Sequence, residues 1–383
     1  MKNRTLIQQI FDASFSSYAK EHFVSSQQMA AVTSLLDCKS GRLGCNVSIC
    51  SDCGHVRIHN NSCRNRNCPN CQAVLKEIWI DKRRSEVIDA PYFHVVFTVP
   101  HELNPLFLAN QKLLYSLFHQ CSSQTLLELA ADPKLLGALP GIIQVLHTWG
   151  QTLEYHPHIH CIVSGGGLTR DLKLRRCGGS FFIPVKILSK KFRGKFLDHL
   201  KKLYARHDLH IPGSCGELTD PSAWQSLIDD LYNKDWCPFI KETFNGFGNA
   251  IEYLGRYANR IAITNTRIRS VSKTHTSFSY RNYRTDRDSV MTLSNEEFIR
   301  RFLLHVLPKG FQKIRYYGFL GNRTKRKMLR IIFDLQGRQH FRQRLAGLSI
   351  SEVLREVWHY DVRICPCCGS FGMRPAGRTF GFG

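Results

Sequence analysis

The chain has 383 residues, 43% of them hydrophobic and 11% aromatic, which is enough for a large folded core and excludes a disordered chain. Its formal net charge of +23 indicates a polyanionic partner, and nucleic acid is the commonest one. Charged residues and prolines interrupt the apolar stretch at residues 126–146, so we expect no membrane span. The first twenty residues lack the apolar centre of a signal peptide, so we expect a cytoplasmic protein with reduced cysteines.

The chain begins with a helical pattern and then changes abruptly to a cysteine-rich segment. Apolar side chains recur at helical spacing over residues 1–37, which predicts a helical lead-in. Two Cys-x-x-Cys motifs follow at a separation close to that of a zinc ribbon, and their cysteines are Cys50, Cys53, Cys68 and Cys71. This segment is short and polar, so bound Zn²⁺ would supply the free energy that orders it. We therefore predict that these four thiolates hold one structural Zn²⁺.

Other polar residues of this segment allow two interpretations each. Cys38, His55 and Cys63 are left over and are candidates for a second zinc site, although packing or free thiols explains them equally well. Arg64 and Arg66 lie in a basic stretch suited to phosphate contacts, and ordinary solvation explains them nearly as well.

A pair of histidines lies on a strand predicted in the middle of the chain. Residues 92–99 form an apolar strand that we expect at the centre of a sheet, and residues 106–129 form a helix. Residues 141–149 form a second strand, expected to pair in a hairpin with the strand that carries His158 and His160. Residues two apart on a strand share a face, so both imidazoles project together as half of a metal site, unless their proximity is chance. A further ligand would be His94, Gln144 or His147, and the sequence does not distinguish them.

Two tyrosines and two arginines repeat at helical spacing within residues 249–260. Tyr253 and Tyr257 are four residues apart and share one face of the expected helix, and Arg256 and Arg260 form a second such pair. A phenolate can attack a phosphodiester while guanidinium groups bind the phosphate. The alternative is a pair of half-buried tyrosines on an amphipathic helix.

The last hundred residues are basic and rich in aromatic side chains. Arg315 lies among cations and rings that can stack unpaired bases, although core packing explains any single ring at least as well. Ser294 and Glu297 predict a helix start with a capping box. Cys365-Pro366-Cys367-Cys368 contains one further Cys-x-x-Cys motif, which alone lacks two ligands for zinc. We expect residues 369–383 to be loose.

Taken together, these motifs resemble those of the rolling-circle transposases of the insertion-sequence ninety-one family. That family belongs to the HUH endonucleases, named for histidine-hydrophobe-histidine. The resemblance covers nearly the whole chain and is most specific at residues 61–72, 156–160, 253–257 and 315–320.

The resemblance implies an antiparallel sheet with flanking helices and a catalytic Mg²⁺ or Mn²⁺ held by His158, His160 and one further polar ligand. Imidazole also suits softer metals, so the identity of the metal stays open. It further implies that Tyr253 or Tyr257 attacks single-stranded DNA at the ends of the element. The products would be a 5′-phosphotyrosine and a free 3′-hydroxyl. The zinc domain would help to recognise those ends.

We therefore expect an α+β protein with three consecutive regions. They are a helical and zinc-ribbon-like domain at residues 1–85, an HUH endonuclease domain at 86–275, and a basic DNA-binding region at 276–383. The expected function is nicking and joining of single-stranded DNA in rolling-circle transposition, with the protein associated with the nucleoid when bound to DNA. A replication initiator or relaxase would use the same chemistry. A non-catalytic zinc-ribbon DNA-binding protein would need only the ribbon and the charge.

Overall fold

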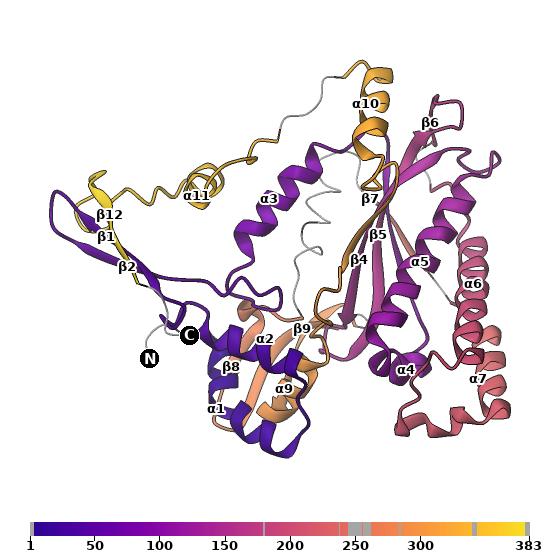
Figure 1. Cartoon of the computed structure of the whole chain (residues 1–383), viewed down its shortest axis with the longest axis horizontal. Coiled ribbons are helices and arrows are strands. Elements are labelled where there is room, and N and C mark those ends of the chain that lie inside the picture. Colours follow the sequence, from indigo (N-terminus) through magenta and orange to yellow (C-terminus); the bar gives the residue numbers. More distant parts are fainter. Residues whose placement is uncertain are drawn as a thin grey trace.

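The computed structural model shows a chain built around one large antiparallel sheet, with two smaller sheets beside it (Figure 1). It describes residues 4–178, 181–236, 238–243, 255, 262–282, 285–338 and 343–379. None of the helices in these ranges is long and apolar enough to cross a membrane.

The large sheet contains six strands in the order β11-β4-β5-β3-β7, with β6 paired to β5. Every pairing is antiparallel. The strands are β3 (Tyr92–Thr98), β4 (Leu139–Trp149), β5 (Tyr155–Leu168), β6 (Leu174–Arg176), β7 (Phe239–Thr243) and β11 (Ile314–Gly318). The structure confirms the expected central strand, since β3 lies between β5 and β7, and it confirms the β4–β5 hairpin.

Helices cover both faces of this sheet, and each face has its own apolar core. On one side are α4 (Asn104–Ala109), α5 (Gln111–Ala130), α6 (Val185–Ala205) and α7 (Pro221–Asn233), to the right of the sheet in Figure 1. Phe97 and Ile159 point to this side and pack with Phe118 and Phe196. On the other side, α3 (Ala73–Arg84) and α10 (Lys325–Leu335) supply Ile80 and Ile332, which join a core with Val145 and Ile162.

The N-terminal helices pack on a segment from the last third of the chain. Helices α1 (Leu6–Glu21) and α2 (Ser26–Asp37) share a core with β8 (Ile268–Val271), β9 (His275–Asn282), β10 (Arg287–Ser294) and α9 (Asn295–Leu303). Phe11 lies at the centre of this core with Phe298 and Phe302. One half of the predicted capping box is present, because the hydroxyl of Ser294 accepts a hydrogen bond from the backbone N–H of Glu297 at 3.2 Å, whereas the carboxylate of Glu297 binds Arg300 and Arg301 instead of the Ser294 backbone.

A third unit joins the two ends of the chain. Strand β12 (Met373–Thr379) pairs antiparallel with β1 (Cys45–Cys50), which also pairs with β2 (Val56–Asn60), far to the left of the large sheet in Figure 1. Helix α11 (Ile350–Trp358) precedes β12 in the chain. Elsewhere in the molecule, short 3-10 helices lie at His101–Leu103, Gly213–Thr219 and Asn265–Arg267. The expectation that residues 369–383 are loose was wrong for the described part, because β1 provides the hydrogen-bonding edge that β12 needs.

The spatial units do not follow the expected boundaries after residues 85 and 275. The last third of the chain contributes α9 to the N-terminal helices, β11 to the large sheet and β12 to the cysteine-rich sheet. These connections depend on long-range strand pairing and packing, which sequence composition does not report. The α+β fold class itself is confirmed.

Candidate metal centres and nucleic-acid site

Three histidines converge on one face of the large sheet. His147 of β4 is the direct cross-strand partner of His158 on β5, and His160 follows two residues later on the same face. Their ligand nitrogens all lie within 4.8 Å of one another. The ring centroids of His147 and His160 are 4.6 Å apart, and those of His158 and His160 are 4.8 Å apart. Three imidazoles so placed have the chemistry of a divalent-metal site.

The three candidates for the further metal ligand, His94, Gln144 and His147, have different positions relative to His158 and His160. His147 joins the cluster, whereas Gln144 points to the opposite face, where its amide lies 2.9 Å from both His119 Nδ1 and Ser122 Oγ. His94 on β3 lies beside the cluster on the same face of the sheet, with its Nε2 2.9 Å from Nδ1 of His160 and the two rings stacked at 14°. His94 therefore orients His160 within the sheet.

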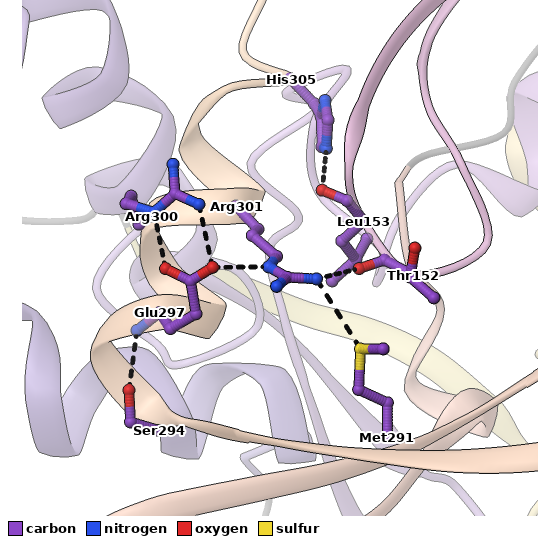
Figure 2. A network of polar contacts seen from close by, with 8 residues as sticks. All are labelled: Thr152, Leu153, Met291, Ser294, Glu297, Arg300, Arg301 and His305. Atoms are coloured by element: carbon purple, nitrogen blue, oxygen red, sulfur yellow. Dashed lines mark hydrogen bonds and ion pairs between the residues drawn. The ribbon is translucent and has the colours of Figure 1, made fainter.

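The hairpin that carries the histidines is held at its turn by α9, as Figure 2 shows. Leu153 is fully buried with a φ of +63°, and its carbonyl accepts a hydrogen bond from His305 Nε2 at 3.1 Å. Arg301 donates to the carbonyl of Thr152 at 2.9 Å. Glu297 in turn binds Arg301 at 2.6 Å, so α9 fixes the turn between His147 and His158 from the outside.

Charge pairing and burial set the protonation of this network. Hydrogen bonds from Arg300 and Arg301 lower the pKa of Glu297 to about 2, against the opposing effect of burial. Burial lowers the pKa of His305 to about 4, so its ring is neutral at pH 7. Neutral His305 uses both nitrogens, because Nδ1 lies 3.2 Å from the Thr148 hydroxyl while Nε2 donates to Leu153.

The cysteines form two separate groups of four, and their membership differs from the prediction. One group contains Cys38, Cys63, Cys68 and Cys71, and the other contains Cys50, Cys53, Cys365 and Cys368. The predicted set of Cys50, Cys53, Cys68 and Cys71 is therefore divided between them. The two N-terminal motifs face different partners because β1 and β2 carry Cys50 and Cys53 away from α2 and α3. His55 belongs to neither group among the described residues.

The first group lies inside the N-terminal core. Cys38 ends α2, and Cys63, Cys68 and Cys71 lie on the loop that precedes α3; Cys38 and Cys68 are both 1% exposed. The sulfur atoms of Cys63 and Cys71 are 3.8 Å apart. A Zn²⁺ ion bound tetrahedrally by thiolates at about 2.3 Å separates the sulfurs by about 3.8 Å, so these residues fit zinc.

The pKa values of the thiols in the first cysteine group also favour the binding of a cation. Hydrogen bonds from Cys63, Cys68 and Cys71 hold the pKa of the Cys38 thiol well below its usual range. The hydrogen bond to Cys38, followed by those to Cys63 and Cys71, raises the pKa of Cys68. Four thiolates this close repel one another, and a doubly charged ion removes that repulsion. Gln8 supports the group by donating to the carbonyls of Leu35 and Cys38 at 2.8 and 2.9 Å.

The predicted arginines have different environments. Arg64 is exposed with a φ of +56°. Arg66 instead donates to the carbonyls of Leu307, Pro308 and Phe311, which ties the loop before β11 to the cysteine-rich segment. Arg315 donates to the Ser116 hydroxyl at 3.1 Å and lies over the ring of Phe311.

The tyrosine motif falls largely on residues outside the described ranges. Tyr253, Arg256, Tyr257 and Arg260 are not among them. Gly255 is described, and it is helical and buried. A Cβ atom there would lie 2.3 Å from Cδ1 of Ile80, so Gly255 packs directly on α3.

The sequence interpretation did not assign Cys365 and Cys368, and it left His147 undecided. A signal for the cysteines exists in the chain: both Cys50–Gly54 and Cys365–Gly369 read Cys-x-x-Cys-Gly. His147 carried no such signal, because its role depends on its register opposite His158.

Comparison with known proteins identifies the class. Residues 10–99 match a family described as "Transposase zinc-binding domain", and residues 141–328 match a family described as "Putative transposase". These two matches define a transposase with a zinc-binding domain. No solved structure matches the chain.

Two relatives extend over most of the chain. It is 40% identical over 364 residues to the "Putative transposase y4qJ" of Sinorhizobium fredii, covering 94% of this chain and 92% of the relative. It is 31% identical over 311 residues to the "Transposase for insertion sequence element IS801" of Pseudomonas savastanoi pv. phaseolicola, covering 80% of this chain and 73% of the relative. The chain therefore belongs to the IS91 family of transposases.

Proposed function

We propose that this transposase nicks and joins single-stranded DNA at the ends of an insertion element, with a 5′-phosphotyrosine as the covalent intermediate of rolling-circle transposition. The observation that supports this most is the convergence of His147, His158 and His160 on one face of the large sheet. A nuclease that acts on phosphodiesters needs positive charge beside the scissile phosphate, and such a group of imidazoles can supply it through a metal.

His147, His158 and His160 would hold the divalent metal, either Mg²⁺ or Mn²⁺, which supplies polarisation of the scissile phosphate when bound. Their nitrogens, all within 4.8 Å of one another, form a suitable donor set. If His160 keeps its hydrogen bond to His94, its ligand atom is Nε2. The hydrogen bond to His94 and the stacking of Trp149 on His147 at 4.4 Å hold these rings in place before DNA binds.

Tyr253 or Tyr257 would be the nucleophile. The phenolic oxygen forms a bond to the phosphorus, the bond from phosphorus to the 3′-oxygen breaks, and the phenolic proton is transferred finally to that oxygen as the 3′-hydroxyl forms. Attack by a 3′-hydroxyl on the phosphotyrosine reverses these changes and joins the strands. Gly255 lies between the tyrosines and packs on Ile80 of α3, the helix that covers the histidine face, which supports this assignment.

The DNA contacts are proposed for arginines on both sides of the site. Arg256 and Arg260 would bind the phosphate beside the tyrosines. Arg64 is exposed on the zinc-binding segment and would contact the DNA backbone at the element ends. Arg66 and Arg315 have protein partners, so their contribution to DNA binding would be to shape the surface around β11.

The test is to incubate the purified full chain with labelled single-stranded element-end DNA and Mn²⁺, followed by a denaturing gel. We expect a covalent protein–DNA band that is lost in the double variant Tyr253→Phe/Tyr257→Phe, while the single variants identify the first nucleophile. DNA binding without a covalent band, on several candidate ends and with both metals, would overturn the proposal in favour of a non-catalytic DNA-binding protein.

A second arm tests the role of His147 without relying on activity. His147→Asn should weaken Mn²⁺ binding, measured by titration calorimetry on the folded protein. His275→Asn is the control, since His275 is exposed on β9 and contacts the neighbouring Thr274. Equal Mn²⁺ affinities in the two variants would remove His147 from the proposed ligand set. A replication initiator or relaxase would give the same biochemical results, and membership of the transposase family favours transposition.

A further inference from the structure

The second group of cysteines joins residues from opposite ends of the chain. Cys50 is the last residue of β1 and Cys53 follows in the turn to β2, whereas Cys365 and Cys368 precede β12. The sulfur atoms of Cys50 and Cys368 are 3.7 Å apart, and those of Cys53 and Cys365 are 3.6 Å apart. These distances are close to the sulfur separation of about 3.8 Å expected around tetrahedral Zn²⁺ and far longer than the disulfide bond of about 2.05 Å.

The two motifs have the same backbone structure. Gly54 and Gly369 have φ values of +70° and +73°, and each donates its N–H to the carbonyl of the first cysteine, at 3.0 and 2.9 Å. The N–H of Cys50 donates to the carbonyl of His55 at 2.9 Å, and that of Cys365 donates to the carbonyl of Ser370 at 2.8 Å, again five residues later. Two such turns facing each other present four thiolates to one ion.

Among the residues that the structure describes, the surrounding sheet buries too few apolar side chains to hold it together without metal. The buried apolar cluster of this unit consists of Cys50, Cys365 and Met373. Ile58 and Phe371 are 63% and 62% exposed. A three-stranded sheet needs an apolar face or an equivalent source of free energy to be stable, and bound zinc is the established substitute in small domains.

Polar contacts around the cysteines fit the same site. The Ser370 hydroxyl lies 3.6 Å from the sulfur of Cys50 and 3.2 Å from the sulfur of Cys368, so one side chain contacts a cysteine from each end of the chain. Arg57 of β2 donates to the carbonyl of Val362, and this contact brings the C-terminal segment onto the ribbon. Cys367 lies between the two C-terminal ligands but is exposed and outside the group.

We propose that Cys50, Cys53, Cys365 and Cys368 bind a second Zn²⁺ ion, separate from the one at Cys38, Cys63, Cys68 and Cys71, and that this ion fastens β12 to β1. The zinc-binding module would then include a C-terminal segment that lies outside both family matches, which end at residues 99 and 328. The inference does not depend on the nicking chemistry.

Zinc stoichiometry of the full chain tests the proposal directly. Mass spectrometry of metal content should give two zinc ions per chain for the unmodified protein and one for the double variant Cys365→Ser/Cys368→Ser. Cys367→Ser is the matched control and should keep both ions. Two ions retained in the double variant, or a single ion in both the unmodified protein and the double variant, would overturn the proposal.

Hydrogen exchange distinguishes loss of this ion from general misfolding. In the double variant, amides of Met373–Thr379 should lose protection, while those of Tyr155–Leu168 in the large sheet stay protected. Cys50→Ser should give the same loss at β12, although the two positions are far apart in the sequence, because one ion joins them. Protection of β12 unchanged in the Cys50→Ser variant would show that the strands pair without the metal and would contradict the proposed role.

Discussion

The large sheet and the cysteine-rich unit of β1, β2 and β12 are both antiparallel, yet they are stabilised in different ways. The large sheet is buried on both faces, with Phe97, Phe118 and Phe196 fully buried on one of them. The cysteine-rich unit buries few apolar side chains and leaves Ile58 largely exposed. The sheet can therefore hold its histidines in place without metal, whereas the cysteine-rich unit needs metal to form.

The N-terminal helices are stabilised by a mixture of apolar packing and metal binding. Their cysteine group is embedded in an apolar core that includes Phe11 and Phe302, so metal and core act together there. In the second group, Cys53 and Cys368 are exposed. This difference predicts that a chelator removes zinc from the second group first and from the first group later.

Loss of the Zn²⁺ ion at the first cysteine group should have the largest effect on the stability of the protein. Structural zinc sites have apparent binding free energies on the order of 10 kcal/mol. Cys68→Ser should therefore remove one zinc ion and expose the core around α1 and α2, seen as lost hydrogen-exchange protection over Leu6–Glu21. Cys121→Ser is the control, because Cys121 is equally buried but lies in α5 on the large sheet. If both variants kept full zinc content, the first group would not be a metal site.

Gly318→Ala should destabilise the large sheet without removing zinc. Gly318 has a φ of +62°, and a Cβ atom there would lie 1.6 Å from the carbonyl oxygen of Pro140. We expect a loss of about 4 kcal/mol in the free energy of unfolding, measured with denaturant. Gly310→Ala separates the two causes, since Gly310 has a φ of +74° but no atom within 4 Å, and should cost only about 1 kcal/mol. Equal costs would mean that the clash is relieved by movement of β4.

Acid should lower the free energy of unfolding through protonation of His305, which lies between the large sheet and the N-terminal helices. Its pKa is lowered to about 4 by burial, below the ordinary value of about 6.5, so the unfolded chain takes up a proton first as the pH falls. The contribution of His305 is complete above pH 6.5 and is lost between about pH 6.5 and 4, at up to about 1.4 kcal/mol per pH unit. Denaturant unfolding at several pH values should show a shallower slope for His305→Gln. The same slope in both proteins would contradict the assignment.

Gly194→Ala should give the smallest effect, and it should be stabilising. Gly194 lies within α6, and a Cβ atom there would have no neighbour within 4 Å. Alanine in a helix interior is favoured over glycine by about 0.5–1 kcal/mol. The large sheet should therefore unfold at higher denaturant concentration, with zinc content and β12 protection unchanged. A change in zinc content would show that the two units are coupled more strongly than their separate cores suggest.

The sequence by itself determined the local elements. Strand-favouring residue types located β3, β4 and β5, with β3 recognised as a continuous apolar run, and the two-residue spacing of His158 and His160 placed both imidazoles on one face. The hairpin and the Ser294 cap followed from local residue types for the same reason. The motifs at the cysteines also indicated zinc, because each pair of ligands lies within one short turn.

The tertiary structure decided which distant elements meet. The choice of His147 over Gln144 depended on strand register, which sends neighbouring side chains to opposite faces. The division of the cysteines depended on β12 pairing with β1, a contact between opposite ends of the chain. Each turn can be read from a few residues, but the partner of each turn is set by long-range packing and strand pairing, and no local pattern encodes those.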